Sequence, residues 1–299
     1  MSLSRRTLLL GAGLALAGCT PRRVEAPAEL LLATGPEGAV FREVGGALAA
    51  AVAEQLPGTR VIAIPTAASV ENIQLLRSGA AQLALSSLDA IEDPPGLRAV
   101  GRLYDSFMQI AVPIASPIRT FADLAGKRIS LGPKGSGTEF TAVRMLREFG
   151  VSAVDERMAH SEASRRVGNG SLDAMLALTG IPTPAITDLK GKVRLIDITP
   201  EATRLADNYQ GPYIPATIPS TTYEGVAANH TFAVPNLLLA RDSLSADVVE
   251  VVTRTVFTET ARIVEGHPEA SRINVRTGIA TGLVPLHDGA MRWFRSAKR

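Results

Sequence analysis

The feature that most constrains the fold is a regular alternation of short apolar segments with longer segments of helical periodicity. Residues 29–34 (ELLLAT), 60–65 (RVIAIP) and 81–87 (AQLALSS) predict three buried strands. Between them, residues 39–56 and 69–79 carry apolar side chains at helical spacing. This strand–helix order predicts an α/β fold in which crossover helices cover a parallel sheet.

A second lobe is predicted to begin after residues 107–114 (FMQIAVPI), where the alternation starts again. The extended run 231–245 (TFAVPNLLLARDSLS) then leads back to the first lobe. We expect residues 29–112 and 236–299 to form lobe 1 and residues 113–235 to form lobe 2. A chain that crosses and returns in this way makes a hinged cleft, into which helix N-termini of both lobes face.

One long helix is predicted near the C-terminus, over residues 245–266. Ser245 is suited to its N-cap, and Gly266 with Pro268 marks its end. It is the longest helix that the sequence predicts.

The N-terminal residues have the layout of an export signal. Arg5 and Arg6 precede an apolar run from Thr7 to Ala17, which is shorter than the roughly 20 residues needed to span a membrane. Residues 16–19 (LAGC) resemble a bacterial lipoprotein cleavage box, so we expect lipidation of Cys19; the alternative is a structural cysteine behind a plain signal peptide. Residues 1–18 would be the signal and 19–28 a tether, and Ser4-Arg5-Arg6 partly resembles a twin-arginine signal.

Composition excludes several classes of function. Lys and Arg number 31 against 29 Asp and Glu, and Arg5 and Arg6 account for the difference, so no basic surface for nucleic acid is expected. The histidines share no metal-ligand spacing, and no G-x-S-x-G elbow occurs; they are His160, His230, His267 and His287. We therefore expect a protein without catalytic residues, metal or cofactor.

Residues 131–146 (LGPKGSGTEFTAVRML) are the strongest candidate for a binding site. A phosphate loop would need Lys after its last glycine, but Thr138 and Glu139 follow Gly137. Ser136 and Glu139 fit a capping box. The flanking glycines also leave helical N–H groups uncovered, which suits an anion such as a carboxylate. The two interpretations of Ser136, helix cap or ligand contact, stay open.

Three other positions in the first lobe carry glycine or a possible cap. Residues 33–41 (ATGPEGAVF) and 66–72 (TAASVEN) form turns between a strand and a helix, the second with Ser69 as the expected N-cap. Gly45 and Gly46 lie inside a predicted helix, where each costs about 1 kcal/mol relative to Ala. Close packing or ligand contact would explain them.

Seven sequence blocks occur in the order of a known family. They are residues 33–49, 65–87, 103–112, 123–139, 176–186, 211–225 and 285–294. Together they resemble the TAXI family of extracytoplasmic solute receptors, which serve tripartite ATP-independent periplasmic (TRAP) transporters. The resemblance implies a two-lobed type II periplasmic-binding-protein fold, a small carboxylate ligand such as an acidic amino acid or an organic acid, and a TRAP membrane permease driven by an ion gradient.

The resemblance also implies a periplasmic, lipid-anchored monomer and a set of ligand contacts. These are Gly35, Val40, Phe41, Ser69, Ser87, Gly135, Ser136, Gly137, Thr138, Pro182, Thr183 and Tyr213.

The first lobe departs from the family pattern. The family's T-G-G-T-G-G-T-Y-Y loop is here residues 34–42, in which Pro36 lacks a backbone donor, Glu37 adds a negative charge, and Val40 and Phe41 replace hydroxyl-bearing residues. The family's T-G-G-S is here TAAS, residues 66–69. We therefore expect a different acid, or a less charged solute.

Two other functions fit the same fold. A sensory receptor would pass a ligand-dependent conformation to a membrane sensor. An enzyme, such as a transferase of porphyrin or histidine synthesis, is disfavoured by the export signal because those pathways are cytosolic.

Overall fold

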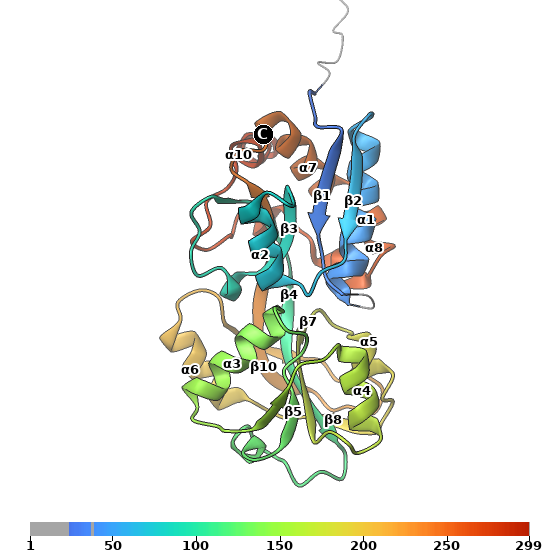
Figure 1. Cartoon of the computed structure of the whole chain (residues 1–299), viewed down its shortest axis with the longest axis vertical. Coiled ribbons are helices and arrows are strands. Elements are labelled where there is room, and N and C mark those ends of the chain that lie inside the picture. Colours follow the sequence, from blue (N-terminus) through green and yellow to red (C-terminus); the bar gives the residue numbers. More distant parts are fainter. Residues whose placement is uncertain (1–23, 37–38, 299) are drawn as a thin grey trace, which may run out of the picture.

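The computed structural model describes residues 24–36 and 39–298, which form two lobes joined by two long strands (Figure 1). Cys19 and Glu37 lie outside the described residues, and so do the predictions made for them. None of the described helices is long and apolar enough to cross a membrane.

Lobe 1 contains the N-terminal and C-terminal parts of the described chain. Its parallel strands are β1 (Glu29–Ala33), β2 (Arg60–Ile64) and β3 (Leu83–Ser87). Its helices are α1 (Val40–Gln55), α2 (Ser69–Ser78), η1 (Leu88–Ala90), α7 (Ala246–Thr258), α8 (Thr260–Val264), η3 (Pro268–Arg272), α9 (Val275–Gly278) and α10 (Asp288–Ala297). The predicted order of strands and helices from β1 to β3 is confirmed.

Lobe 2 repeats the same design with the middle of the chain. Its strands are β5 (Arg128–Ser130), β6 (Val154–Glu156), β7 (Ala174–Thr179), β8 (Val193–Leu195) and β9 (Ile214–Ile218). Its helices are η2 (Ala122–Leu124), α3 (Gly137–Glu148), α4 (His160–Gly168), α5 (Pro184–Thr187) and α6 (Thr199–Asn208). Strands β6, β5 and β7 are parallel neighbours.

Two antiparallel strands, β4 (Leu97–Pro113) and β10 (Asn229–Arg241), run through both lobes (Figure 1). In lobe 1, β10 pairs with β3; in lobe 2, it pairs with β9, and β4 pairs with β7 and β8. The whole sheet has the order β2-β1-β3-β10-β4-β7-β5-β6 and is therefore mixed rather than purely parallel. The lobe boundaries expected from the sequence fall on these two strands and stay a prediction.

Each lobe has apolar side chains packed on both faces of its part of the sheet. In lobe 1, one cluster joins α1, α7 and α10 to the sheet, and a second cluster packs α2 on the other face. In lobe 2, α3 and α6 cover one face while α4 and α5 cover the other. Two separate cores let each lobe keep its structure while the angle between the lobes changes.

The predicted C-terminal helix is interrupted, which corrects the sequence interpretation. Ser245 is the N-cap, although its side chain makes no capping bond, and α7 stops at Thr258 before α8 begins. The break allows Ile263 to pack in the core of lobe 1 and Gly266 to approach the Glu43 carbonyl on α1. The longest described helix is therefore α1, with 16 residues.

The glycine pair inside α1 yields a matched stability prediction. A Cβ on Gly45 would collide with Thr34, whereas a Cβ on Gly46 would meet nothing within 4 Å. We therefore expect Gly45→Ala to destabilise the protein by about 1–3 kcal/mol through overpacking. Gly46→Ala should stabilise it by about 1 kcal/mol through helix propensity. Urea unfolding of both variants checks this, and equal shifts of the same sign would contradict it.

Candidate ligand-binding site

A cavity lies between the lobes, where helix N-termini and strand ends of both lobes meet. Its volume is about 40 Å³, well below the roughly 300–1,000 Å³ of most small-molecule sites, so the lobes must part slightly to admit a ligand larger than a few water molecules. Its hydroxyl-bearing lining residues are Ser69, Ser87, Ser106, Ser136, Thr138 and Thr179. Its other lining residues are Pro36, Ala39, Phe41, Ala67, Ala68, Pro133, Gly137, His160, Leu178 and Asn236.

The N-terminus of α3 forms the lobe 2 side of the cavity. The Ser136 side chain accepts a hydrogen bond from the Glu139 amide at 3.1 Å, so its predicted capping role is confirmed. Glu139 reaches back to the amide of Gly135 at 2.7 Å, not to that of Ser136, because the Ser136 amide already donates to the Pro133 carbonyl. Among the described residues, no acceptor pairs with the amides of Gly137 and Thr138. Two N–H groups at the positive end of a helix are therefore free to bind an anion.

Two serines of lobe 1 face these amides across the cleft. The Ser69 hydroxyl accepts from the Ser87 amide at 3.0 Å, and the two hydroxyls lie 3.2 Å apart. A Cβ built on Gly137 would lie 2.8 Å from each hydroxyl oxygen. Only a glycine at 137 therefore allows the lobes to approach this closely.

The N-terminus of α2 is already occupied by lobe 2. The carbonyl of Gly135 accepts hydrogen bonds from the amides of Val70 and Glu71, at 3.1 and 3.2 Å. Gly135 adopts φ 80°, which favours glycine at this close contact. The expectation that Ser69 caps α2 is wrong: Ala68 is the N-cap, and Ser69 points its hydroxyl toward β3 instead.

Ala68 adopts φ 96° and ψ −142°, a conformation that glycine accepts readily and alanine does not. The backbone is therefore strained at the position where the TAXI pattern has glycine. We expect Ala68→Gly to raise the free energy of unfolding by about 1 kcal/mol as this strain is relieved. Ala67→Gly, at a position without positive φ, is the control and should lower stability slightly. Thermal unfolding that ranks the two variants in the opposite order would contradict the prediction.

His160, the first residue of α4, brings a third polar wall to the cavity. Its Nε2 lies 3.4 Å from the Thr138 hydroxyl, while Nδ1 is buried without a partner among the described residues. Burial lowers the pKa of His160 to about 4, so the imidazole is neutral at pH 7.

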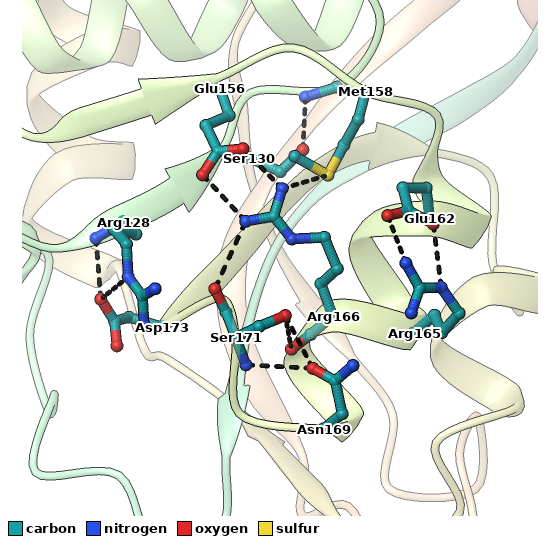
Figure 2. Close-up of polar contacts among 11 residues, drawn as sticks. Arg128, Ser130, Glu156, Met158, Glu162, Arg165, Arg166, Asn169, Ser171 and Asp173 are labelled. Atoms are coloured by element: carbon teal, nitrogen blue, oxygen red, sulfur yellow. Dashed lines mark hydrogen bonds and ion pairs between the residues drawn. The ribbon is translucent and has the colours of Figure 1, made fainter.

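A polar network away from the cavity holds α4 in place (Figure 2). Arg166 of α4 binds Glu156 on β6 and donates to the carbonyl of Ser171, in the turn before β7. The amide of Met158 donates to the carbonyl of Gly132 at 3.0 Å. The Arg166 contacts tie the end of α4 to β6, and the Met158 contact holds the segment before His160 beside the loop that carries the α3 N-terminus.

The crossing strands supply the floor of the cavity. Asn236 on β10 and Ser106 on β4 are buried and bond to each other through the Asn236 amide nitrogen, at 2.8 Å. Asn236 pairs in register with Ser87 on β3. Because both strands pass through both lobes, this floor lies where a hinge motion would bend them.

A second set of contacts joins the lobes beside the cavity. Asp89 of lobe 1 is buried and accepts hydrogen bonds from Thr141 and Tyr213 of lobe 2. Burial raises the pKa of Asp89. Arg144 of α3 bonds to the Tyr213 hydroxyl at 2.8 Å and pairs with Glu92 of lobe 1 at 2.9 Å. These contacts hold the lobes in a closed arrangement.

Half of the ligand contacts expected from the sequence line the cavity. They are Phe41, Ser69, Ser87, Ser136, Gly137 and Thr138. The other six are not among its lining residues: Gly35, Val40, Gly135, Pro182, Thr183 and Tyr213.

Three of these six are already packed or hydrogen-bonded within the protein. Val40 is buried in the lobe 1 core, and Gly35 accepts from the Thr66 amide. Thr183 bonds to Gln109 and, through its amide, to Tyr223. Their direct contact with a ligand stays a prediction.

Sequence reasoning missed Ser106, His160, Thr179 and Asn236. Ser106 and Asn236 lie within long apolar runs, and their meeting depends on strand register between distant segments. His160 begins α4 shortly after the strand β6. The other candidates also lie where a helix starts after a strand, so this position could have marked His160 as a site residue.

Comparison with solved structures identifies the fold. PhnD1 from Prochlorococcus marinus in complex with methylphosphonate matches with TM-score 0.57 and 11% identity, covering 83% of this chain and 92% of that one. XAC2383 from Xanthomonas citri bound to ATP matches with TM-score 0.55 and 12% identity, covering 90% and 95%. The periplasmic binding protein BugD matches with TM-score 0.55 and 13% identity, covering 90% and 96%. The fold is that of type II periplasmic binding proteins, as the sequence predicts.

The sequence profile of one family spans nearly the whole described chain, matching residues 32–297. The chain therefore belongs to the NMT1-like family.

Proposed function

We propose that this protein is an extracytoplasmic solute receptor that captures a small carboxylate between its two lobes. The observation that carries the proposal is the pair of free amides at the α3 N-terminus, which face the hydroxyls of Ser69 and Ser87 across a cavity between the lobes. Backbone donors and a helix dipole stabilise an anion without a lysine or arginine. Similarity in fold to periplasmic binding proteins, one of them in complex with methylphosphonate, supports this function.

Binding is proposed to be coupled to closure of the lobes. The Gly135 carbonyl reaches the α2 amides, and Asp89 reaches Thr141 and Tyr213, only when the lobes are together. A ligand that bridges the lobes would stabilise this form and present a new surface to a membrane partner. The protein would bind its ligand without converting it, so the ligand should be recovered unchanged.

The proposed partner is a TRAP-type permease, and the support for it is the set of seven TAXI-like sequence blocks. The alternative is a sensory receptor that acts on a membrane sensor. Loss of solute uptake after deletion of the gene, with no change in gene expression, favours the permease. The reverse result favours the sensor.

A ligand screen tests the binding function. Thermal unfolding should be measured against amino acids and organic acids, and a ligand at 100 times its dissociation constant should stabilise the protein by about 2.7 kcal/mol. Stabilisation by at least one carboxylate is the expected result. The absence of any shift across both panels would contradict the function.

Cys19 is expected to anchor the protein to a membrane through its lipid chains. Several chains on one residue give stable anchoring, whereas a single chain binds reversibly. Cys19→Ala should therefore move the protein from the membrane fraction to the soluble or uncleaved form. Unchanged partitioning and processing in cell fractionation would contradict lipidation.

A further inference from the structure

We propose that the cavity selects a carboxylate with one negative charge, an apolar body and one uncharged polar group that bonds to His160. The inference rests on the proposed function and specifies its ligand. It distinguishes such an acid from dicarboxylates and from amino acids, which carry a second charged group.

The cavity offers a single place for a negative charge. The free amides of Gly137 and Thr138 form that place. The other helix N-terminus that faces lobe 2, that of α2, already has the Val70 and Glu71 amides bonded to Gly135. A second carboxylate would therefore lie in the cavity without a matching donor set, which is costly for a buried charge.

The described lining also holds no charged side chain that could pair with a second group. The two carboxylates beside it are already used: Glu71 accepts from the Ala67 amide, and Glu139 accepts from the Gly135 amide and pairs with Arg157. An α-ammonium group would consequently find no free carboxylate among the described residues that line the cavity. Zwitterionic amino acids are thus disfavoured along with dicarboxylates.

His160 lines the cavity and carries a further polar atom that has no partner among the described residues. The residue as a whole is half-buried, but its Nδ1 is buried and has no partner among the described residues. The lowered pKa of the ring keeps it neutral, so it suits an uncharged hydroxyl or carbonyl group rather than a second carboxylate. An unpaired buried nitrogen gains most from a ligand that completes its hydrogen bond.

The remaining lining favours an apolar ligand body. Phe41, Pro133, Leu178 and Pro36 line the cavity together with Ala39. Phe41 stands where the TAXI pattern has a hydroxyl-bearing residue, so the departure of the first loop removes hydrogen-bonding capacity. A short alkyl chain can occupy this wall without leaving polar groups unpaired.

Four-carbon acids of matched length test the selection on the full chain by calorimetric titration. The probes are 2-hydroxybutyrate, 2-oxobutyrate, butyrate, 2-aminobutyrate and succinate. We expect the hydroxy or oxo acid to bind best, butyrate about tenfold more weakly, and 2-aminobutyrate and succinate about a hundredfold more weakly. Tighter binding of succinate, 2-aminobutyrate, or any other dicarboxylate or amino acid overturns the selection but leaves the receptor function standing. If neither an organic acid nor an amino acid binds, the proposed function fails with it.

A histidine variant tests the role of His160 separately. His160→Leu should reduce the preference for the hydroxy or oxo acid over butyrate from about tenfold to about one, with butyrate affinity kept as the sign of an intact fold. His230→Leu, on an exposed histidine of β10 that bonds to Thr217, is the matched control and should keep the preference. An unchanged preference in folded His160→Leu protein would overturn the assignment.

Discussion

Replacement of Gly137 by valine is expected to weaken ligand binding by about a hundredfold or more, while the protein stays folded. A Cβ at this position would lie 2.8 Å from the hydroxyl oxygens of Ser69 and Ser87, on the opposite lobe. The branched side chain would thus hold the lobes apart and also cover the amides that are proposed to bind the carboxylate. Position 137 is the first of α3 and has no positive φ, so valine fits the backbone there.

Two further variants separate closure from capping. Gly137→Ala adds only the Cβ and should have a smaller effect, about tenfold. Ser136→Ala removes the hydrogen bond to the Glu139 amide and should cost about 1 kcal/mol of stability, with little change in affinity if Ser136 serves only as a cap. Calorimetric titration and thermal unfolding give both quantities. Full affinity in folded Gly137→Val protein would refute the anion site.

Glu269 is expected to make stability depend on pH. It lies on η3 of lobe 1, is 2% exposed, and accepts a hydrogen bond from the amide of Ile181 in lobe 2. Burial raises its pKa to about 7, against the smaller lowering effects of Arg272 and of the Ile181 amide. The Nε atom of Arg272 lies 2.8 Å from Oε1 of Glu269 and forms an ion pair with it. The geometry of this pair is not that of a hydrogen bond, so Oε1 has no hydrogen-bond donor among the described residues.

The direction of the pH effect on stability follows from the raised pKa of Glu269. The folded protein holds the Glu269 proton up to about pH 7, whereas the unfolded chain releases it near pH 4.3. The stabilisation is full below the unfolded pKa and is lost as pH rises through the folded value.

Glu269→Gln, which stays uncharged, should therefore be about 3–4 kcal/mol more stable than the natural protein at pH 8 and only about 1 kcal/mol more stable at pH 5. Glu265→Gln, at a neighbouring exposed carboxylate, is the control. Urea unfolding at both pH values measures the difference, and a Glu269→Gln effect that is the same at both would contradict the prediction.

The sequence predicted the N-terminal part of lobe 1 well because its signals are local. Apolar runs and helical periodicity from residue 29 to residue 87 determine where strands and helices begin and end. The crossing of β4 and β10 between the lobes could not be located in this way. Both strands are buried almost throughout, so their hydrophobic pattern does not change where one lobe ends and the other begins.

The candidate site was predictable only where its residues follow a strand and start a helix. Ser136, Gly137 and Thr138 were found because a glycine turn leads into a helix there. Asn236 and Ser106 reach the cavity through antiparallel pairing of segments more than a hundred residues apart, and single-sequence patterns do not contain that register.

The local sequence around Ser69 predicts the wrong N-cap for α2. Its position before a helical segment suggested an N-cap, yet the strained Ala68 takes that role, and Ser69 bonds to β3. Serine is a common N-cap residue, so its N-cap propensity favoured Ser69. In the structure, the first amides of α2 donate instead to the Gly135 carbonyl of lobe 2.

The most direct test of the account is a crystal structure of the protein with the tightest-binding carboxylate from the ligand screen. The account predicts closed lobes, with a carboxylate oxygen about 2.7–3.1 Å from the amide nitrogens of Gly137 and Thr138 and the ligand's other end against His160. A ligand carboxylate held elsewhere, with these two amides bonded only to water, would contradict it.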